Sequence, residues 1–171
     1  MSIKSPYRFH GLARGMVSEE RLNALISFTK LEGDFVKRGL YAHFVRGFNA
    51  ENVAMIYYNC SGNFSRDMKK IRNIAANYEE LIDYQGDINE LVPGNVSQRK
   101  LDIFIDSVQL KSAKVKAVLR DHFVHGKSKK DIVVNHSTTH SNINREVKKI
   151  QAVADKFQDL HNITVNQIND R

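Results

Sequence analysis

The sequence contains an internal repeat, and this repeat constrains its fold more than any other feature. Residues 15–81 align with residues 94–160 without a gap, and 20 of the 67 aligned positions are identical. Aligned residues are always 79 positions apart, so helices and turns of equal length are expected in both segments. Two copies are fewer than the three or more that a solenoid needs. We therefore expect two tandem small domains, or one unit with pseudo-two-fold symmetry.

Apolar residues within each repeat recur at helical spacing. At the end of the first repeat they follow one another at steps of four, three, four and three residues, which places them on one face of a helix. These residues are Phe64, Met68, Ile71, Ala75 and Tyr78, and their counterparts are Ile143, Val147, Ile150, Ala154 and Phe157. Ser18 and Asn49 have the chemistry of helix N-caps. With two prolines in 171 residues, the sequence predicts an all-α protein made of two similar helical domains.

A helix-turn-helix pattern occurs in each repeat. In the first repeat, a short helix capped by Asn49 is followed by a polar turn and by a second helix that carries arginine and lysine on its outer face. The pattern runs from Gly47 to Ile71, and it recurs from Gly126 to Ile150. The second helix of such a motif presents polar and basic side chains at its N-terminal end. The helix dipole and the free backbone N–H groups also favour phosphate at that end.

The repeat predicts the domain boundaries. We expect a first helix-turn-helix repeat over residues 15–84, a connector over 85–93, a second repeat over 94–161, and terminal arms over 1–14 and 162–171. The connector contains Gly86 and Pro93, but it is too apolar for a purely flexible linker. We therefore expect the connector to pack, at least in part, against a neighbouring helix.

Both repeats supply side chains that DNA recognition uses. Asparagine can pair with adenine edges, arginine can read guanine or enter a narrow minor groove, and lysine contacts backbone phosphates. The candidate DNA-binding residues are Asn63, Ser65, Arg66, Lys69 and Lys70 in the first repeat, and Lys127, Lys129, Lys130, Asn142, Asn144, Arg145, Lys148 and Lys149 in the second. Because the second repeat carries additional lysines before its last helix, we expect it to make the larger electrostatic contribution to binding.

The charge balance agrees with a polyanionic partner. The formal net charge is +7 and the pI is about 9.5. Residues 1–85 hold 12 basic and 9 acidic residues and residues 86–171 hold 14 and 10, so the charge is not confined to a tail. The single Cys60 excludes an intramolecular disulfide and suits a reducing compartment. No apolar run approaches the roughly 18–20 residues of a membrane span, and the N-terminus lacks the apolar core of a signal peptide. We predict a cytoplasmic protein, without membrane association, that is nucleoid-associated when bound to DNA.

Three short segments carry motifs of a known kind of regulator. Residues 91–97 read Leu-Val-Pro-Gly-Asn-Val-Ser, residues 123–132 read Phe-Val-His-Gly-Lys-Ser-Lys-Lys-Asp-Ile, and residues 61–65 read Ser-Gly-Asn-Phe-Ser. They resemble the PapB family of fimbrial adhesin regulators. That family has a Leu-x-Pro-Gly-x-Met-Ser opening, a Gly-His-Ser-Arg-Lys-Glu-Val entry into the helix-turn-helix, and an Asn-Gly-x-Phe-Ser start of the recognition helix. The resemblance implies a bacterial transcription regulator of fimbrial or other surface-adhesin virulence genes. It also implies binding to AT-rich operator duplex, often as oligomers on repeated sites.

Each repeat keeps a different part of that pattern. The basic residue of the family's Ser-Arg-Lys segment falls on Ala50 in the first repeat and on Lys129 in the second, whereas the family's Phe-Ser is replaced by Ile143 and Asn144 in the second. Unequal DNA binding by the two repeats is therefore expected. Two alternatives remain open. Plasmid repressors of the TrfB/KorA type, which control conjugation or maintenance genes, have a similar helix-turn-helix plan. Alternatively, the duplicated helices bind another transcription factor or self-associate.

Other motifs in the sequence are weaker. His122, His125, His136 and His140 have a spacing that could hold zinc, but among them His122 alone aligns with a histidine, His43. A packing role for these histidines is favoured over a metal site. The sequence has no phosphate-cradling glycine loop, no nucleophile elbow and no repeated carboxylate pair, so we do not expect an enzyme. It indicates neither a cofactor nor a small-molecule ligand. The expected partners are double-stranded DNA and further copies of the chain on DNA.

Overall fold

The computed structural model describes residues 12–58, 60–84 and 87–169, and all the regular secondary structure in these ranges is helical. These ranges contain no strand, so the prediction of an all-α protein is confirmed. The helices are α1 (Glu19–Ile26), α2 (Asp34–Phe44), α3 (Ala50–Val53), the π-helical segment η2 (Ala54–Tyr58), α4 (Ser61–Leu81), α5 (Gln98–Ser107), α6 (Ala113–Phe123), α7 (Lys129–His136) and α8 (His140–Asn169). Within the same ranges, no helix combines the length and the apolar character needed to cross a bilayer.

The helices of the two halves begin at equivalent positions. The starts of α1 and α5, of α2 and α6, of α3 and α7, and of α4 and α8 are each 79 residues apart, which is the shift found in the sequence. The predicted N-caps are confirmed. The side chain of Ser18 accepts a hydrogen bond from the Arg21 N–H at 3.1 Å, and that of Asn49 accepts one from the Asn52 N–H at 2.8 Å. Local capping chemistry therefore sets where these helices begin.

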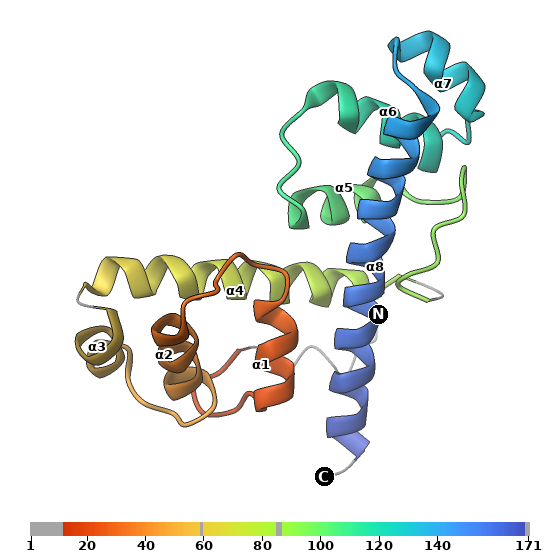
Figure 1. Ribbon diagram of the computed structural model, residues 1–171. Helices are drawn as coiled ribbons and strands as arrows, with labels where there is room; N and C mark the ends of the chain where they lie inside the picture. Colours follow the sequence, from red (N-terminus) through yellow and green to blue (C-terminus); the bar gives the residue numbers. More distant parts are fainter. Residues whose placement is uncertain (1–11, 59, 85–86, 170–171) are drawn as a thin grey trace. The chain divides into compact units, whose positions relative to one another are not determined.

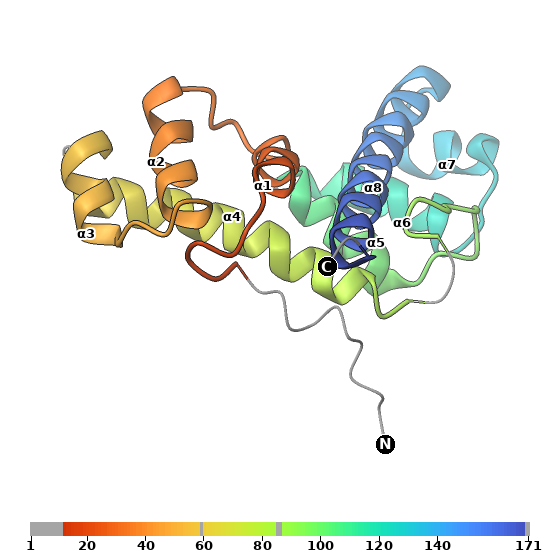
Figure 2. The same ribbon diagram turned by 90° about the horizontal axis from the view of Figure 1, so that it is seen from below.

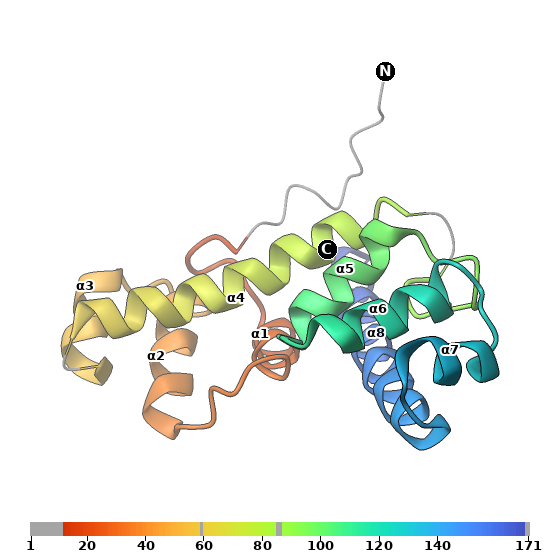
Figure 3. The ribbon, with the colours of Figure 1, turned by 90° about the horizontal axis from the view of Figure 1, so that it is seen from above.

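The described residues form two compact units. One contains the residues up to Asp83 together with those from Asp159 onward, and the other is Tyr84–Gln158. In the first unit, α1, α2 and α3 lie along one side of the long helix α4 (Figures 1 and 3). The predicted inward stripe of α4 is buried there, together with Leu40 and Phe44 of α2. The shorter helices thus pack against the apolar face of α4.

The second unit repeats this arrangement. Helices α5, α6 and α7 gather around the first part of α8 (Figure 2). Its core includes the fully buried side chains of Leu101, Phe104 and Phe157, and the Phe104 and Phe157 rings are 6.0 Å apart. The segment after residue 86 also packs in this unit. Ile88 is buried, and its N–H donates to the Gln158 side chain at 3.0 Å, as expected for a partly packed connector.

Helix α8 contributes to both units. Its residues up to Gln158 belong to the second unit, and its residues from Asp159 belong to the first. Leu160 is fully buried, and the Tyr78 hydroxyl is 3.0 Å from Nδ1 of His161. The sequence predicted a terminal arm over 162–171; α8 extends to residue 169, and Thr164 is buried on it. Of the arm predicted over residues 1–14, residues 1–11 lie outside the described residues.

Paired glycines lie close together at the two ends of a two-helix segment in each repeat. Gly94 and Gly126 both have positive φ, at 79° and 64°, and a Cβ added to Gly94 would lie 3.1 Å from the Cα of Gly126. Gly15 and Gly47 form the same close approach 79 residues earlier. A side chain would be strained by the backbone angle at all four positions, and at Gly15, Gly94 and Gly126 its Cβ would also lie only 3.1 Å from the paired backbone. The shape of each repeat therefore depends on glycine at both positions.

Candidate nucleic-acid interface

The first turns of α8 expose several of the predicted DNA-binding residues. The Thr139 side chain caps the helix by accepting a hydrogen bond from the Asn142 N–H at 3.2 Å. Asn142, Arg145 and Lys148 are exposed on the following turns. The helix start also carries free N–H groups and the positive end of the helix dipole. This end of α8 can therefore bind an anionic backbone while its side chains reach outward.

A buried carboxylate lies among these cations. Glu146 is 6% exposed and accepts hydrogen bonds from Arg145 Nε at 2.9 Å and from Lys149 Nζ at 3.0 Å. Although burial favours its neutral form, the hydrogen bonds from Lys149 and Arg145 hold the pKa of Glu146 below its ordinary value. Lys149 is thus tethered within the helix. Lys148 forms no hydrogen bond or ion pair with the described residues and is exposed.

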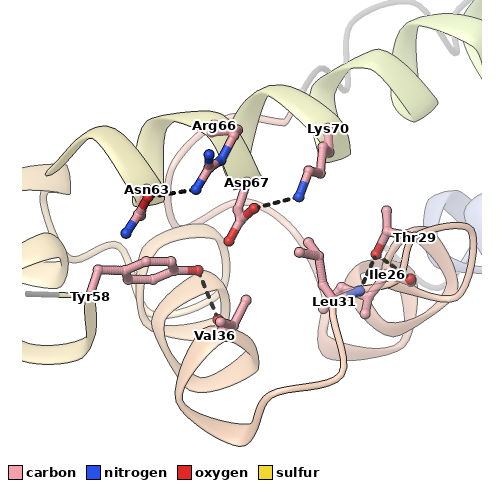
Figure 4. Close-up of polar contacts among 9 residues, drawn as sticks. All are labelled: Ile26, Thr29, Leu31, Val36, Tyr58, Asn63, Arg66, Asp67 and Lys70. Carbon is pink, nitrogen blue, oxygen red and sulfur yellow. Dashed lines mark hydrogen bonds and ion pairs between the residues drawn. The ribbon is translucent and has the colours of Figure 1, made fainter. Parts of the chain in front are cut away.

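The start of α4 also places a buried acid beside a lysine in the first unit, whereas its arginine binds an asparagine and not the acid. The buried carboxylate of Asp67 lies 2.8 Å from Lys70 Nζ, and Arg66 donates to the Asn63 side chain at 2.5 Å (Figure 4). Lys69 is exposed on the same helix. Of the two adjacent lysines in each repeat, one is held by an acid and the other projects into solvent. The shared carboxylate position, Asp67 and Glu146, was missed in the sequence although the alignment of the repeats pairs the two residues.

The remaining predicted residues are placed in different ways. Ser65 is exposed on α4, and Lys130 is exposed on α7. Lys129 donates to Asn144 Oδ1 at 2.7 Å, which links α7 to α8. Lys127 forms an ion pair with Asp121 at 2.9 Å. The structure therefore brings Lys129, at the start of α7, together with Asn144 in the first turns of α8, whereas Lys127 is engaged with α6.

Asp121 of α6 connects several elements of the second unit. It is buried on α6, and its carboxylate also lies 2.8 Å from Nε2 of His136 on α7. Burial favours the neutral acid, but the hydrogen bonds from His136 and Lys127 hold the pKa of Asp121 below its ordinary value. Together these contacts tie α7 to α6. Among the described residues, no group of three or more histidine, cysteine or acidic side chains is arranged to hold a metal ion.

The buried histidines pack against aromatic rings. The rings of His43 and Phe44 are 4.9 Å apart, as are those of His122 and Phe123. Burial lowers the pKa of both histidines and so favours the neutral ring. His43 Nδ1 also lies 2.9 Å from the carbonyl oxygen of Phe48. These contacts confirm the packing role expected for His43 and His122.

The short helix of the first unit differs from α7. In its π-helical part, the Tyr58 ring lies over Gly39 of α2, and its hydroxyl donates to the Val36 carbonyl at 3.2 Å (Figure 4). A Cβ on Gly39 would lie 2.6 Å from Cε2 of Tyr58. The second repeat has Val118 and Ser137 at these two positions. In the first repeat the larger of the two side chains is on η2, and in the second repeat it is on α6. The two candidate DNA-binding surfaces are therefore not equivalent.

Known proteins resemble the second repeat of this chain in particular. The family model of the adhesin biosynthesis transcription regulatory protein, PapB, matches residues 84–163. The regulatory protein FanB of Escherichia coli is 31% identical over 87 residues, which are 51% of this chain and 82% of the relative. No solved structure matches the chain. The family match covers the second unit and leaves the first repeat outside it. Because FanB is matched over most of its length, this chain belongs to the PapB family of adhesin biosynthesis transcription regulatory proteins.

Proposed function

We propose that this transcription regulator binds AT-rich operator duplex upstream of fimbrial or other adhesin genes. It would do so through two helix-turn-helix units in one chain. The observation that carries the proposal is the exposed set of Asn142, Arg145 and Lys148 on the first turns of α8. These side chains combine base-reading and phosphate-binding chemistry at the positive end of a helix. Arginine is suited to the narrow minor groove of AT-rich DNA, where the negative potential is enhanced.

The two units would contribute unequally. In the second unit, Lys129 at the start of α7 donates to Asn144, and Thr139 caps α8, so the start of α8 is held both by α7 and by its own cap. In the first unit, α4 offers Asn63, Arg66 and Lys69 in the same order. The family match falls on the second unit. We therefore assign the main DNA contact to α8 and a weaker, accessory contact to α4.

Protein association is a second candidate function, and the first unit motivates it. Met55 and Ile56 of η2 are 80% and 64% exposed, whereas the second repeat has one exposed apolar residue there, Val134, followed by Asn135. Exposed large apolar side chains in a group are typical of a protein-binding surface. Such a surface would let copies of the chain associate on repeated operator sites.

Sedimentation velocity of the full chain, alone and with an AT-rich duplex, separates the two functions. The proposal expects a protein–DNA complex at about 50 mM salt that is weakened by two or more orders of magnitude at about 200 mM, because released counterions drive binding. Met55→Ser with Ile56→Ser serves as the control that removes the apolar group. A chain that oligomerises but has no duplex affinity at low salt would favour association as the function.

A further inference from the structure

An open pocket of about 500 Å³ lies in the first unit, away from the exposed side chains of α4. Its lining comes from α1, from α2, from Arg46 and Phe48 in the loop after α2, and from Tyr57 of η2. The walls combine three aromatic side chains with three cationic ones: Tyr41, Phe48, Tyr57, Lys37, Arg38 and Arg46. This volume is in the range of pockets that hold small ligands. No small-molecule ligand was expected from the sequence, because these residues are distributed over two helices and a loop.

The cations of this pocket are poorly compensated. Glu19 is the carboxylate in the lining, and it forms no ion pair with Lys37, Arg38 or Arg46. The described part of the chain offers these three cations no other acidic partner. The Arg46 guanidinium instead lies over the Tyr41 ring, 5.2 Å from its centroid. The pocket therefore has a net positive potential beside flat aromatic surfaces.

The second repeat has an acidic side chain at a position where this pocket has none. Where the first repeat has Ala42, the second has Asp121, which lies within 3 Å of Lys127 Nζ and His136 Nε2. Phe48 and Tyr57 occupy the positions of those two residues.

A second ion pair of the second unit is missing as well. Asp102 and Arg120 lie 3.1 Å apart there, and the first repeat has Asn23 and Tyr41 at those positions. The first repeat has thus lost both carboxylates and gained aromatic rings. It has also gained a cation, because Arg38 replaces the alanine found at position 117.

We propose that this pocket binds a small aromatic anion, that is, a planar ring bearing a phosphate or carboxylate group. The anionic group would be bound by Arg38, Arg46 and Lys37, because guanidinium groups form paired, charge-assisted hydrogen bonds with such oxygens. The ring would stack on Tyr57 and Phe48. Nucleoside monophosphates and aromatic carboxylates share this chemistry. Since η2 directly precedes α4, a ligand here would contact the segment that leads into the first unit's candidate DNA-binding helix.

Calorimetric titration of the full chain tests the proposal with four probes. Adenosine monophosphate and salicylate each carry a ring and an anion, whereas adenosine and inorganic phosphate each carry one of the two. We expect one of the first two to bind at least tenfold more tightly than both half-ligands, and the one that binds identifies the ligand source. Two-dimensional NMR should place the shifted amides on α2 and η2. Binding of inorganic phosphate as tight as that of either complete probe, or no binding by either complete probe, would overturn the proposal.

Variants make the assignment specific. Arg38→Ala introduces the residue of the second repeat at an exposed position, so the fold is retained, and it should weaken the binding probe about tenfold, since a factor of ten corresponds to one good charged contact. Lys116→Ala is the matched control, because Lys116 is the counterpart of Lys37 in the second repeat, and it should have no effect. Equal effects of the two variants would overturn the assignment. So would a loss of duplex affinity in Arg38→Ala without binding of any small probe, because the patch would then be a phosphate contact for DNA.

Discussion

The carboxylate of Glu146 lies 3.0 Å from the ammonium group of Lys149, and Asp67 and Lys70 form the same pair at 2.8 Å in the first unit. A buried acid on a helix that faces DNA would repel phosphate unless a neighbouring cation neutralised it. We infer that the second of the two adjacent lysines in each repeat, Lys70 or Lys149, mainly neutralises the acid. The first lysine remains available to a phosphate group.

Lys149→Ala should therefore lower the free energy of unfolding, by about 0.5–1 kcal/mol, since half of the Lys149 side chain is exposed and solvent screens the pair. Lys148→Ala should change it by less than about 0.5 kcal/mol, as expected for a surface substitution. Urea unfolding of both variants measures the difference. Equal stabilities would show that the pair with Glu146 has no structural role.

The ion pairs of Asp121 predict a dependence on pH. Its pKa is lowered in the fold, so its contribution to stability is present above its ordinary value of about 3.9 and is lost as the pH falls through the folded value. Asp121→Asn should destabilise the chain by about 1.5–3 kcal/mol at pH 7, as for hydrogen bonds to a charged group. The difference from the unmodified chain should shrink as the pH falls through the lowered pKa of Asp121 in the fold. Asp106→Asn, at an exposed position of α5, is the control. A difference that persists unchanged in acid would contradict this role of the carboxylate.

The contact between Gly39 and Tyr58 predicts an effect on packing. Gly39→Ala would place a Cβ 2.6 Å from the tyrosine ring, so we expect a loss of about 1–3 kcal/mol in spite of the better helix propensity of alanine. Gly62→Ala is a suitable control, because that Cβ would meet nothing closer than 3.7 Å. Thermal unfolding of the two variants gives the comparison. A Gly39→Ala chain as stable as the control would mean that η2 shifts to admit the methyl group at no cost.

The last part of α8 follows the second repeat in the chain but belongs to the first unit, so we expect it to stabilise that unit. Leu160→Ala removes a fully buried side chain, and such truncations cost about 2–5 kcal/mol. Because residues from Asp159 belong to the first unit, amide hydrogen exchange should accelerate in α1 and α4. Asn166→Ala, at an exposed position of the same helix, should leave the exchange rates unchanged. Acceleration confined to α5 and α6 would contradict the prediction.

Local patterns predicted much of this fold. The caps at Ser18 and Asn49 and the apolar stripe of α4 depend on residues within a few positions of one another, so the sequence displays them directly. Because the repeats are 79 residues apart, the same helix starts could also be predicted for the second repeat.

Contacts between distant residues could not be predicted in this way. The π-helical turn η2 depends on the space that Gly39 leaves for Tyr58, 19 positions away. The continuation of α8 into the first unit depends on Tyr78 and its partner His161, 83 positions apart. At the candidate site, the sequence identified the cations but not which of them an acid holds, because that depends on the burial of Glu146.

The most direct test of the account is the affinity of two matched double variants for an AT-rich duplex, measured by fluorescence anisotropy over a series of salt concentrations. Arg145→Ala with Lys148→Ala changes α8, and Arg66→Ala with Lys69→Ala changes the equivalent positions of α4. We expect the α8 variant to lose at least tenfold in affinity, with a salt slope reduced by about one for the lost phosphate contact, and the α4 variant to lose less. An α8 variant with unchanged affinity and unchanged salt slope would contradict the assignment of α8 as the DNA-binding helix.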